Sequence, residues 1–193
     1  MQRFLAYVEP WQTVLDVGGN PAIWKLVPQD RLPRIVYLNM PRAHEPEDDT
    51  ARLVFGDGCR LPFGDQSFDW VFSNSVIEHV GSAERQAAFA AEVRRVGRRY
   101  WVQTPNRWFP VEQHLLTPLI HWAPKSWQRW LVPRFTVWAL LSHADPAERR
   151  FYFDHFLDDI RLLSANEFVG LFPDGKLKRE RVLGWTKSLI VLR

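Results

Sequence analysis

The sequence predicts an α/β fold: a doubly wound, mostly parallel, seven-stranded Rossmann-like sheet that ends in a C-terminal antiparallel hairpin. Three observations predict it. Short apolar runs alternate with helical patterns or long connections, an order typical of parallel sheets with right-handed crossovers. Polar residues follow the apolar runs, which places them at the carboxyl ends of the predicted strands, the edge at which such sheets bind their ligands. Two apolar stretches near the end of the chain flank a glycine turn, which indicates the hairpin.

Each element follows from a local pattern. Apolar runs that end in polar or glycine residues predict strands at 13–18, 34–40, 53–58, 68–74 and 99–105. Helices are expected at 21–27, which begins with a proline, at 82–96, which has helical apolar spacing, and at 164–172. Ser164 and Glu167 have the spacing of a capping box for the last helix. The hairpin is expected at about 176–183 and 187–192.

Composition and length indicate one globular domain, residues 1–193. The chain is 46% hydrophobic and 24% charged, which is ordinary for a folded protein. Its single cysteine, Cys59, excludes an internal disulfide framework. The sequence has no charged-then-apolar leader and no apolar run of membrane-spanning length, so we expect a cytoplasmic protein. A net charge of +3 is too small to indicate nucleic-acid binding.

A tryptophan- and proline-rich insertion is expected at about 105–160, after the fifth strand. Residues 105–146 hold six of the fourteen prolines and five of the ten tryptophans. Within it, residues 115–141 mix aromatic and aliphatic side chains with basic ones, a combination favoured at bilayer interfaces. Ordinary burial, a lid, a homodimer or partner-subunit surface, and peripheral membrane contact all remain open for this segment.

The stretch LDVGGNP, residues 15–21, points to a ligand. A glycine pair costs backbone entropy and is kept where φ is positive or where a group approaches the main chain closely. Gly18 and Gly19 follow a buried strand that ends at Asp16 and Val17, and they precede a predicted helix. The dinucleotide fingerprint G-x-G-x-x-G with an acid about 20 residues on is not matched, which argues against a nicotinamide enzyme.

Several ordered blocks carry a resemblance to a known family. VLDVGGNPAIW, LNM, GDGCRLPFGDQSFDWVFSNSVIEHVG and RYWVQTPNRWFPVEQH occur in this order, followed by a tail LFPDGKLKRERVLGWTKSLIVL. Together they resemble the class I S-adenosylmethionine-dependent methyltransferases, and within them a bacterial small-molecule subgroup with the SNSVIEHVG signature. The resemblance implies a methyltransferase that uses S-adenosylmethionine and acts on a small-molecule or glycan- or lipid-linked acceptor.

The resemblance also implies which residues bind the cofactor. Gly18 and Gly19 would pass against its methionine part, and Asp16 would orient this turn or reach the ammonium group. Asn39 stands where the class usually has an acid for the ribose hydroxyls, with one carbonyl acceptor in place of two carboxylate oxygens. The adenine would lie at Asp57 and Gly58, and Asn74 and Ser75 would border the sulfonium.

Chemistry at the methyl group requires alignment, exclusion of water and, for some acceptors, removal of a proton. His79 is the candidate base because the unperturbed pKa of histidine is near neutrality. A structural role, in which His79 only hydrogen-bonds the backbone, is the alternative. Glu78 is a doubtful partner for it, since neighbours on a helix point in different directions. The resemblance places substrate contacts in the segment after the fifth strand, at Asn106, Trp108, Glu112 and His114.

Two further predictions concern metals and partners. No spacing among the six histidines matches a ligand motif such as H-E-x-x-H, and Ser75 stands where a related quinone-methylating group has the first carboxylate of a metal site. No metal is therefore expected. The alternative to an enzyme is a non-catalytic, methyltransferase-like subunit that binds a partner protein, suggested by Asn39 and by the short segment before the first strand.

Overall fold

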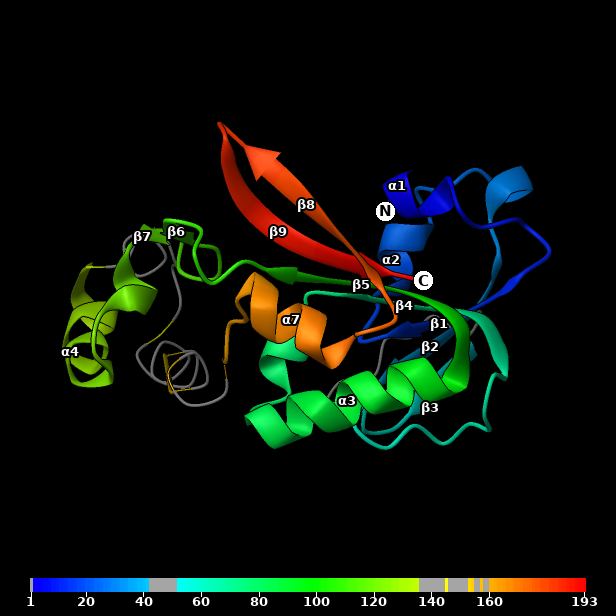
Figure 1. Cartoon of the computed structure of the whole chain (residues 1–193), viewed down its shortest axis with the longest axis horizontal. Coiled ribbons are helices and arrows are strands. Elements are labelled where there is room, and N and C mark those ends of the chain that lie inside the picture. The colour runs from blue at the N-terminus through cyan, green and yellow to red at the C-terminus, as the bar shows by residue number, and fades with distance from the viewer. Residues whose placement is uncertain (1, 42–51, 136–144, 146–152, 155–156, 158–159) are drawn as a thin grey trace.

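The computed structural model describes residues 2–41, 52–135, 145, 153–154, 157 and 160–193. The central feature is a seven-stranded sheet of order β3-β2-β1-β4-β5-β9-β8 (Figure 1). β1 to β5 pair in parallel, whereas β9 runs antiparallel to β5 and β8 antiparallel to β9. The predicted fold class and its C-terminal hairpin are confirmed. The strands are β1 (Thr13–Val17), β2 (Arg34–Asn39), β3 (Arg52–Phe55), β4 (Phe68–Asn74), β5 (Gly97–Pro105), β8 (Lys176–Val182) and β9 (Trp185–Leu192).

Two hydrophobic clusters cover the two faces of the sheet. On one face the helices α3 (Ala83–Val96) and α7 (Ala165–Leu171) pack through Phe89, Val93 and Phe168, all fully buried. On the other face α1 (Gln2–Leu5) and α2 (Pro21–Trp24) place Phe4 and Trp24 against the strands. Figure 1 shows these helix pairs on opposite sides of the sheet. The β1 and β4 strands at the centre are covered on both faces, as expected for parallel strands.

Helix ends follow local capping chemistry. Ser82 accepts a hydrogen bond from the Arg85 amide at the start of α3. The capping box of Ser164 and Glu167 forms as predicted at the start of α7. The α2 helix is a single turn, shorter than the predicted 21–27: Asn20 caps its start, and it ends at Trp24, four residues before Pro28. The α1 helix has no counterpart among the predicted elements.

The segment after β5 forms a small unit with its own core. It comprises β6 (Val111–Glu112), β7 (Thr117–Pro118), the 3-10 helix η3 (Ile120–Trp122) and α4 (Lys125–Phe135), which includes Pro133. Leu115, Ile120 and Val132 from this unit form a third buried cluster, separate from the two at the sheet. The rest of the predicted insertion, including most of 136–159, lies outside the described residues. No helix in the described ranges has the length and apolar character needed to cross a membrane.

Candidate active site

A cavity of about 530 Å³ lies at the carboxyl ends of β1, β2, β3 and β4. This is the edge of a doubly wound sheet at which ligands bind, and the size suits a small organic molecule. The 3-10 helix η2 (Ile77–His79) directly follows β4 and supplies His79 to the cavity wall. A second 3-10 helix, η1 (Gln29–Arg31), connects α2 to β2 and supplies no wall residue. Five of the predicted site residues contribute to the cavity wall: Gly18, Asn39, Asp57, Gly58 and His79.

The glycine pair is required by the backbone after β1. Gly18 has a φ of 77°, and a Cβ there would lie 2.5 Å from Cγ2 of Val76. A Cβ on Gly19 would lie 1.9 Å from Oδ2 of Asp16. Both contacts are shorter than any non-bonded carbon contact allows, so neither position accepts a side chain without movement. Gly18 faces the cavity, while Gly19 closes over the carboxylate behind it.

Asp16 lies beneath this turn rather than in the cavity wall. Its side chain is buried, and the indole Nε1 of Trp24 donates a hydrogen bond to its Oδ2 at 2.7 Å. Burial raises the pKa of Asp16 from 3.8 to about 7, although the hydrogen bond from Trp24 works in the opposite direction. The carboxyl group thus connects the glycine turn to α2.

Asn39 is the last residue of β2, and Asp57 lies two residues after the end of the neighbouring strand β3; both line the cavity. The amide Nδ2 of Asn39 donates to the carbonyl of Gly19 at 2.9 Å, which joins β2 to the glycine turn. Both carboxylate oxygens of Asp57 accept from the Arg85 guanidinium, at 3.1 and 3.0 Å, and Oδ1 also accepts from the Cys59 amide. The amide hydrogen bond and the nearby guanidinium hold the pKa of Asp57 below its usual value.

Gly58 has a packing role that the sequence does not reveal. A Cβ at this position would lie 2.9 Å from Cε2 of Phe89 and 3.2 Å from Cγ1 of Val17. The main chain therefore passes directly over the Phe89 ring, and the two residues form adjacent parts of the cavity wall.

The structure does not bring Asn74 into the cavity wall. Asn74 is the exposed last residue of β4, and Ser75 follows with a φ of 58°. The Ser75 amide donates to the carbonyl of Gln103, and this turn directs Ser75 and Val76 to the cavity instead. The predicted strand 68–74 has the bounds that the structure gives β4, but the sequence did not indicate the positive φ of Ser75 that turns the chain here.

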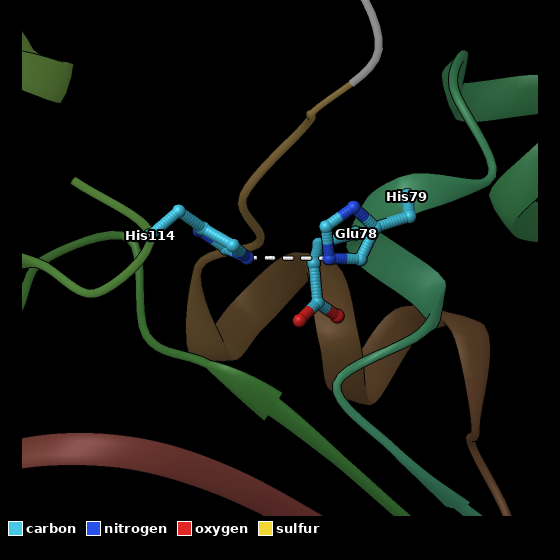
Figure 2. A group of neighbouring side chains, drawn as sticks. All are labelled: Glu78, His79 and His114. Atoms are coloured by element: carbon cyan, nitrogen blue, oxygen red, sulfur yellow. Dashed lines mark hydrogen bonds between the residues drawn. The ribbon is translucent and has the colours of Figure 1, made fainter. Parts of the chain in front are cut away.

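His79, which lines the cavity, contacts His114, which does not (Figure 2). Their Nε2 atoms are 3.2 Å apart, and the rings are nearly perpendicular. Nδ1 of His114 lies 2.6 Å from Oε1 of the buried Glu112, whose Oε2 accepts from the Leu115 amide at 2.7 Å. Burial lowers the pKa of His114, but the hydrogen bond and charge of Glu112 outweigh it and leave the pKa above its usual value. Two of the four predicted substrate residues thus join the predicted base.

Glu78 belongs to the same group of side chains. It is fully buried, and its Oε2 accepts a hydrogen bond from Oγ1 of Thr104 at 2.9 Å. Within the described part of the chain, its Oε1 has no hydrogen-bond partner. Burial raises the pKa of Glu78 from 4.5 to about 7. One ligand-type atom from each of Glu78, His79 and His114 lies within 4.8 Å of the others, which the sequence spacing did not indicate.

Asn106 and Trp108 lie outside this group. Nδ2 of Asn106 donates to the carbonyl of Thr186, so the side chain braces the loop against β9. The Trp108 side chain is 57% exposed, and its ring is 6.2 Å from that of Trp122. Neither residue is part of the cavity wall.

Comparison with known proteins identifies a similar domain model and similar folds. A family model described as "Methyltransferase domain" matches residues 34–99, about a third of the chain, from β2 through α3. A search of curated protein sequences found no match. Among solved structures, a SAM-dependent methyltransferase from Methanosarcina mazei aligns over 100% of this chain and 96% of its own, with a TM-score of 0.56 and 12% identity. The chain therefore has the Rossmann-like fold of SAM-dependent methyltransferases, and residues 34–99 match a methyltransferase-domain model.

Two other solved structures share the fold. A Rhodobacter sphaeroides chain described as a Zn-dependent alcohol dehydrogenase gives a TM-score of 0.64 at 13% identity, covering 99% of this chain and 87% of that one. The complex of the Trm112 methyltransferase activator of Haloferax volcanii with a methyltransferase gives 0.55 at 16% identity, with 99% and 86% covered. At these identities the likeness shows the fold alone.

Proposed function

We propose that this chain is an S-adenosylmethionine-dependent methyltransferase whose cofactor occupies the cavity beside Gly18. The observation that carries the proposal is the convergence of the glycine turn, Asn39 and Asp57 on one cavity. This is where a methyltransferase fold needs a close backbone approach, an acceptor for ribose hydroxyls and an acceptor for the adenine amino group. Bound there, the cofactor supplies an activated methyl group on a positively charged sulfur.

The proposed roles of the polar residues follow from their contacts. Gly18 lets the main chain approach the amino-acid end of the cofactor. The Asp16 carboxyl group supports the turn, because it packs against Gly19 and accepts the hydrogen bond from Trp24. Asn39 has its amide N–H engaged by Gly19, which directs its carbonyl oxygen to another donor such as a ribose hydroxyl. Asp57 has one acceptor site left for an adenine amino group, on Oδ2, because an ionised carboxylate has about four such sites and Arg85 and the Cys59 amide use three.

We further propose that His79 is the catalytic residue for an acceptor that must lose a proton. His79 forms part of the cavity wall, where an acceptor oxygen would approach the methyl group. The imidazole of His79 takes the proton of the acceptor, while His114 and Glu112 act as positioning residues that hold the imidazole pair in place.

The exposed surface of α4 supports one class of acceptor. The α4 helix exposes Trp127, Trp130 and Phe135, and the guanidinium of Arg134 lies over the Trp130 ring. Aromatic and basic side chains together favour the interface of a bilayer. We propose that the described part of residues 115–141 contacts a membrane that holds a lipid- or glycan-linked acceptor. Co-sedimentation with anionic vesicles tests it, and unchanged sedimentation of a Trp127→Ala, Trp130→Ala double variant would reject it.

The alternative function is a partner-binding subunit without catalysis; the complex with an activator among the fold relatives supports only the partner-binding part of this alternative. Calorimetric titration with S-adenosylhomocysteine separates the two. We expect micromolar binding to the wild-type protein, and at least a 100-fold loss in Gly18→Val. Gly64→Val is the matched control, because a Cβ on Gly64 has no atom within 4 Å among the described residues. No binding to the wild-type protein at about 1 mM ligand (roughly −4 kcal/mol) would favour the subunit.

A further inference from the structure

The contact between Nε2 of His79 and Nε2 of His114 requires a bridging proton or cation. Both imidazoles present Nε2, and these nitrogens are 3.2 Å apart. Two nitrogen lone pairs repel one another, so either a proton or a cation must lie between them. Figure 2 shows both rings directed at this point from different segments, His79 from η2 and His114 from the loop between β6 and β7.

Glu112 prepares His114 to be a ligand. A proton on Nδ1 of His114 is held by Oε1 of Glu112 at 2.6 Å, which leaves the Nε2 lone pair directed at His79. Glu112 is itself buried and fixed by the Leu115 amide. Histidines that bind metal ions usually donate their other ring N–H to a carboxylate or carbonyl in this way.

Glu78 supplies an independent observation. Its side chain has no exposed surface, and Oε1 has no hydrogen-bond partner among the residues that the structure describes. An uncompensated carboxylate oxygen in the protein interior is costly, and a bound cation removes that cost. The carboxylate lies beside the histidine pair in Figure 2, with one ligand atom of each of the three residues within 4.8 Å of the others.

The spacing and the donor types agree with one class of ion. Two nitrogens bound to tetrahedral zinc at about 2.05 Å are about 3.3 Å apart, close to the separation observed here. Two imidazoles and one carboxylate suit borderline divalent ions such as Zn²⁺, whereas Mg²⁺ and Ca²⁺ prefer oxygen ligands. Three protein ligands also leave a fourth position open, as in catalytic zinc sites.

We propose that Glu78, His79 and His114 form a site for a divalent transition-metal ion, Zn²⁺ by preference, with its open position toward the cavity. His79 lies in the cavity wall, which gives the ion an entry path. If the proposed function holds, an acceptor hydroxyl at the open position would have a lowered pKa, since a bound metal ion acidifies its oxygen ligands. The Nε2 of His79 would then serve as a ligand, and activation of the acceptor would depend on the ion instead of on proton transfer to the imidazole.

The test uses the full chain, stripped with a chelator and free of cofactor, so that it does not depend on S-adenosylmethionine binding. Calorimetric titration with Zn²⁺ should give one site with submicromolar affinity, and Mg²⁺ should not bind. Titration with Co²⁺ should produce the intense visible absorption of a tetrahedral complex. Failure of cofactor binding with intact metal binding would reject the proposed function alone, and the reverse result would reject the metal site alone.

Matched variants locate the site. We expect His114→Gln and His79→Gln each to weaken Zn²⁺ binding at least 100-fold, and Glu112→Gln to weaken it about 10- to 100-fold through the lost orientation of His114. The control is His121→Gln, because His121 contacts the carbonyl of Arg107 instead of this group. Circular dichroism in chelator confirms the fold of each variant. Absence of binding to the wild-type protein at about 100 μM Zn²⁺ (about −5.5 kcal/mol), or equal binding by wild type and both histidine variants, would overturn the proposal.

Discussion

Asp16→Asn should change how the stability of the fold depends on pH. In the folded chain the pKa of Asp16 is raised to about 7 by burial, against 3.8 for the free side chain. Between these values the folded state holds a proton that the unfolded state has released. The free energy of unfolding must therefore fall as the pH rises from about 4 to about 7, and it should be level above that.

The size of the effect follows from the shift. One pKa unit corresponds to about 1.4 kcal/mol, so the full shift is worth roughly 4 kcal/mol. Between pH 5 and pH 8 the wild-type protein should lose roughly 2–3 kcal/mol through this group alone. The amide in Asp16→Asn keeps an oxygen to accept the Trp24 hydrogen bond, but it does not titrate. Neighbouring Tyr37 does not interfere, because burial and the Asp16 charge raise its pKa to about 12.

Urea unfolding at intervals from pH 5 to pH 8, in the presence of chelator, measures this difference. We expect the wild-type curve to fall more steeply than the Asp16→Asn curve by roughly 2–3 kcal/mol over the range. Asp30→Asn, which changes an exposed carboxylate in η1, should leave the slope as in wild type. Parallel curves for wild type and Asp16→Asn would refute the reasoning, since the buried carboxyl would then titrate as it does in the unfolded chain.

Two more predictions concern packing and capping. Gly58→Ala should destabilise the fold by about 1–3 kcal/mol, because the added Cβ lies 2.9 Å from the buried ring of Phe89, and an unchanged urea midpoint would contradict this. Ser164→Ala should cost about 1 kcal/mol, because it removes the side chain that accepts the Glu167 amide at the start of α7; thermal unfolding measures it, and a loss below about 0.3 kcal/mol would exclude the capping role.

The fold was accessible from the sequence because its signals are local. Apolar runs located the buried strands, Ser164 and Glu167 marked the start of α7, and the apolar stretches around Gly184 marked the hairpin. Local sequence signals failed to predict elements whose formation depends on tertiary packing. The α1 helix is held by Phe4 in a cluster of distant aromatic rings, which no pattern in its few residues indicates.

The candidate site was accessible only in part for the same reason. Asn39 ends β2, and Gly18 and Asp57 lie one and two residues beyond the ends of β1 and β3, so the topology alone brings them to one edge. The positive φ of Ser75, which the sequence does not indicate, places Ser75 and Val76 in the cavity wall and leaves Asn74 outside it. His79, Glu112 and His114 were each predicted as site residues, but the contact between His79 and His114 was not, because the two are 35 residues apart in sequence.

A crystal structure with S-adenosylhomocysteine bound tests the central claim most directly. The account predicts density in the cavity at the ends of β1 to β4, with the amino-acid end of the ligand at Gly18, the adenine beside Asp57, and the sulfur toward His79. Density at any other place, or a cavity closed by the protein's own side chains at saturating ligand, would contradict it.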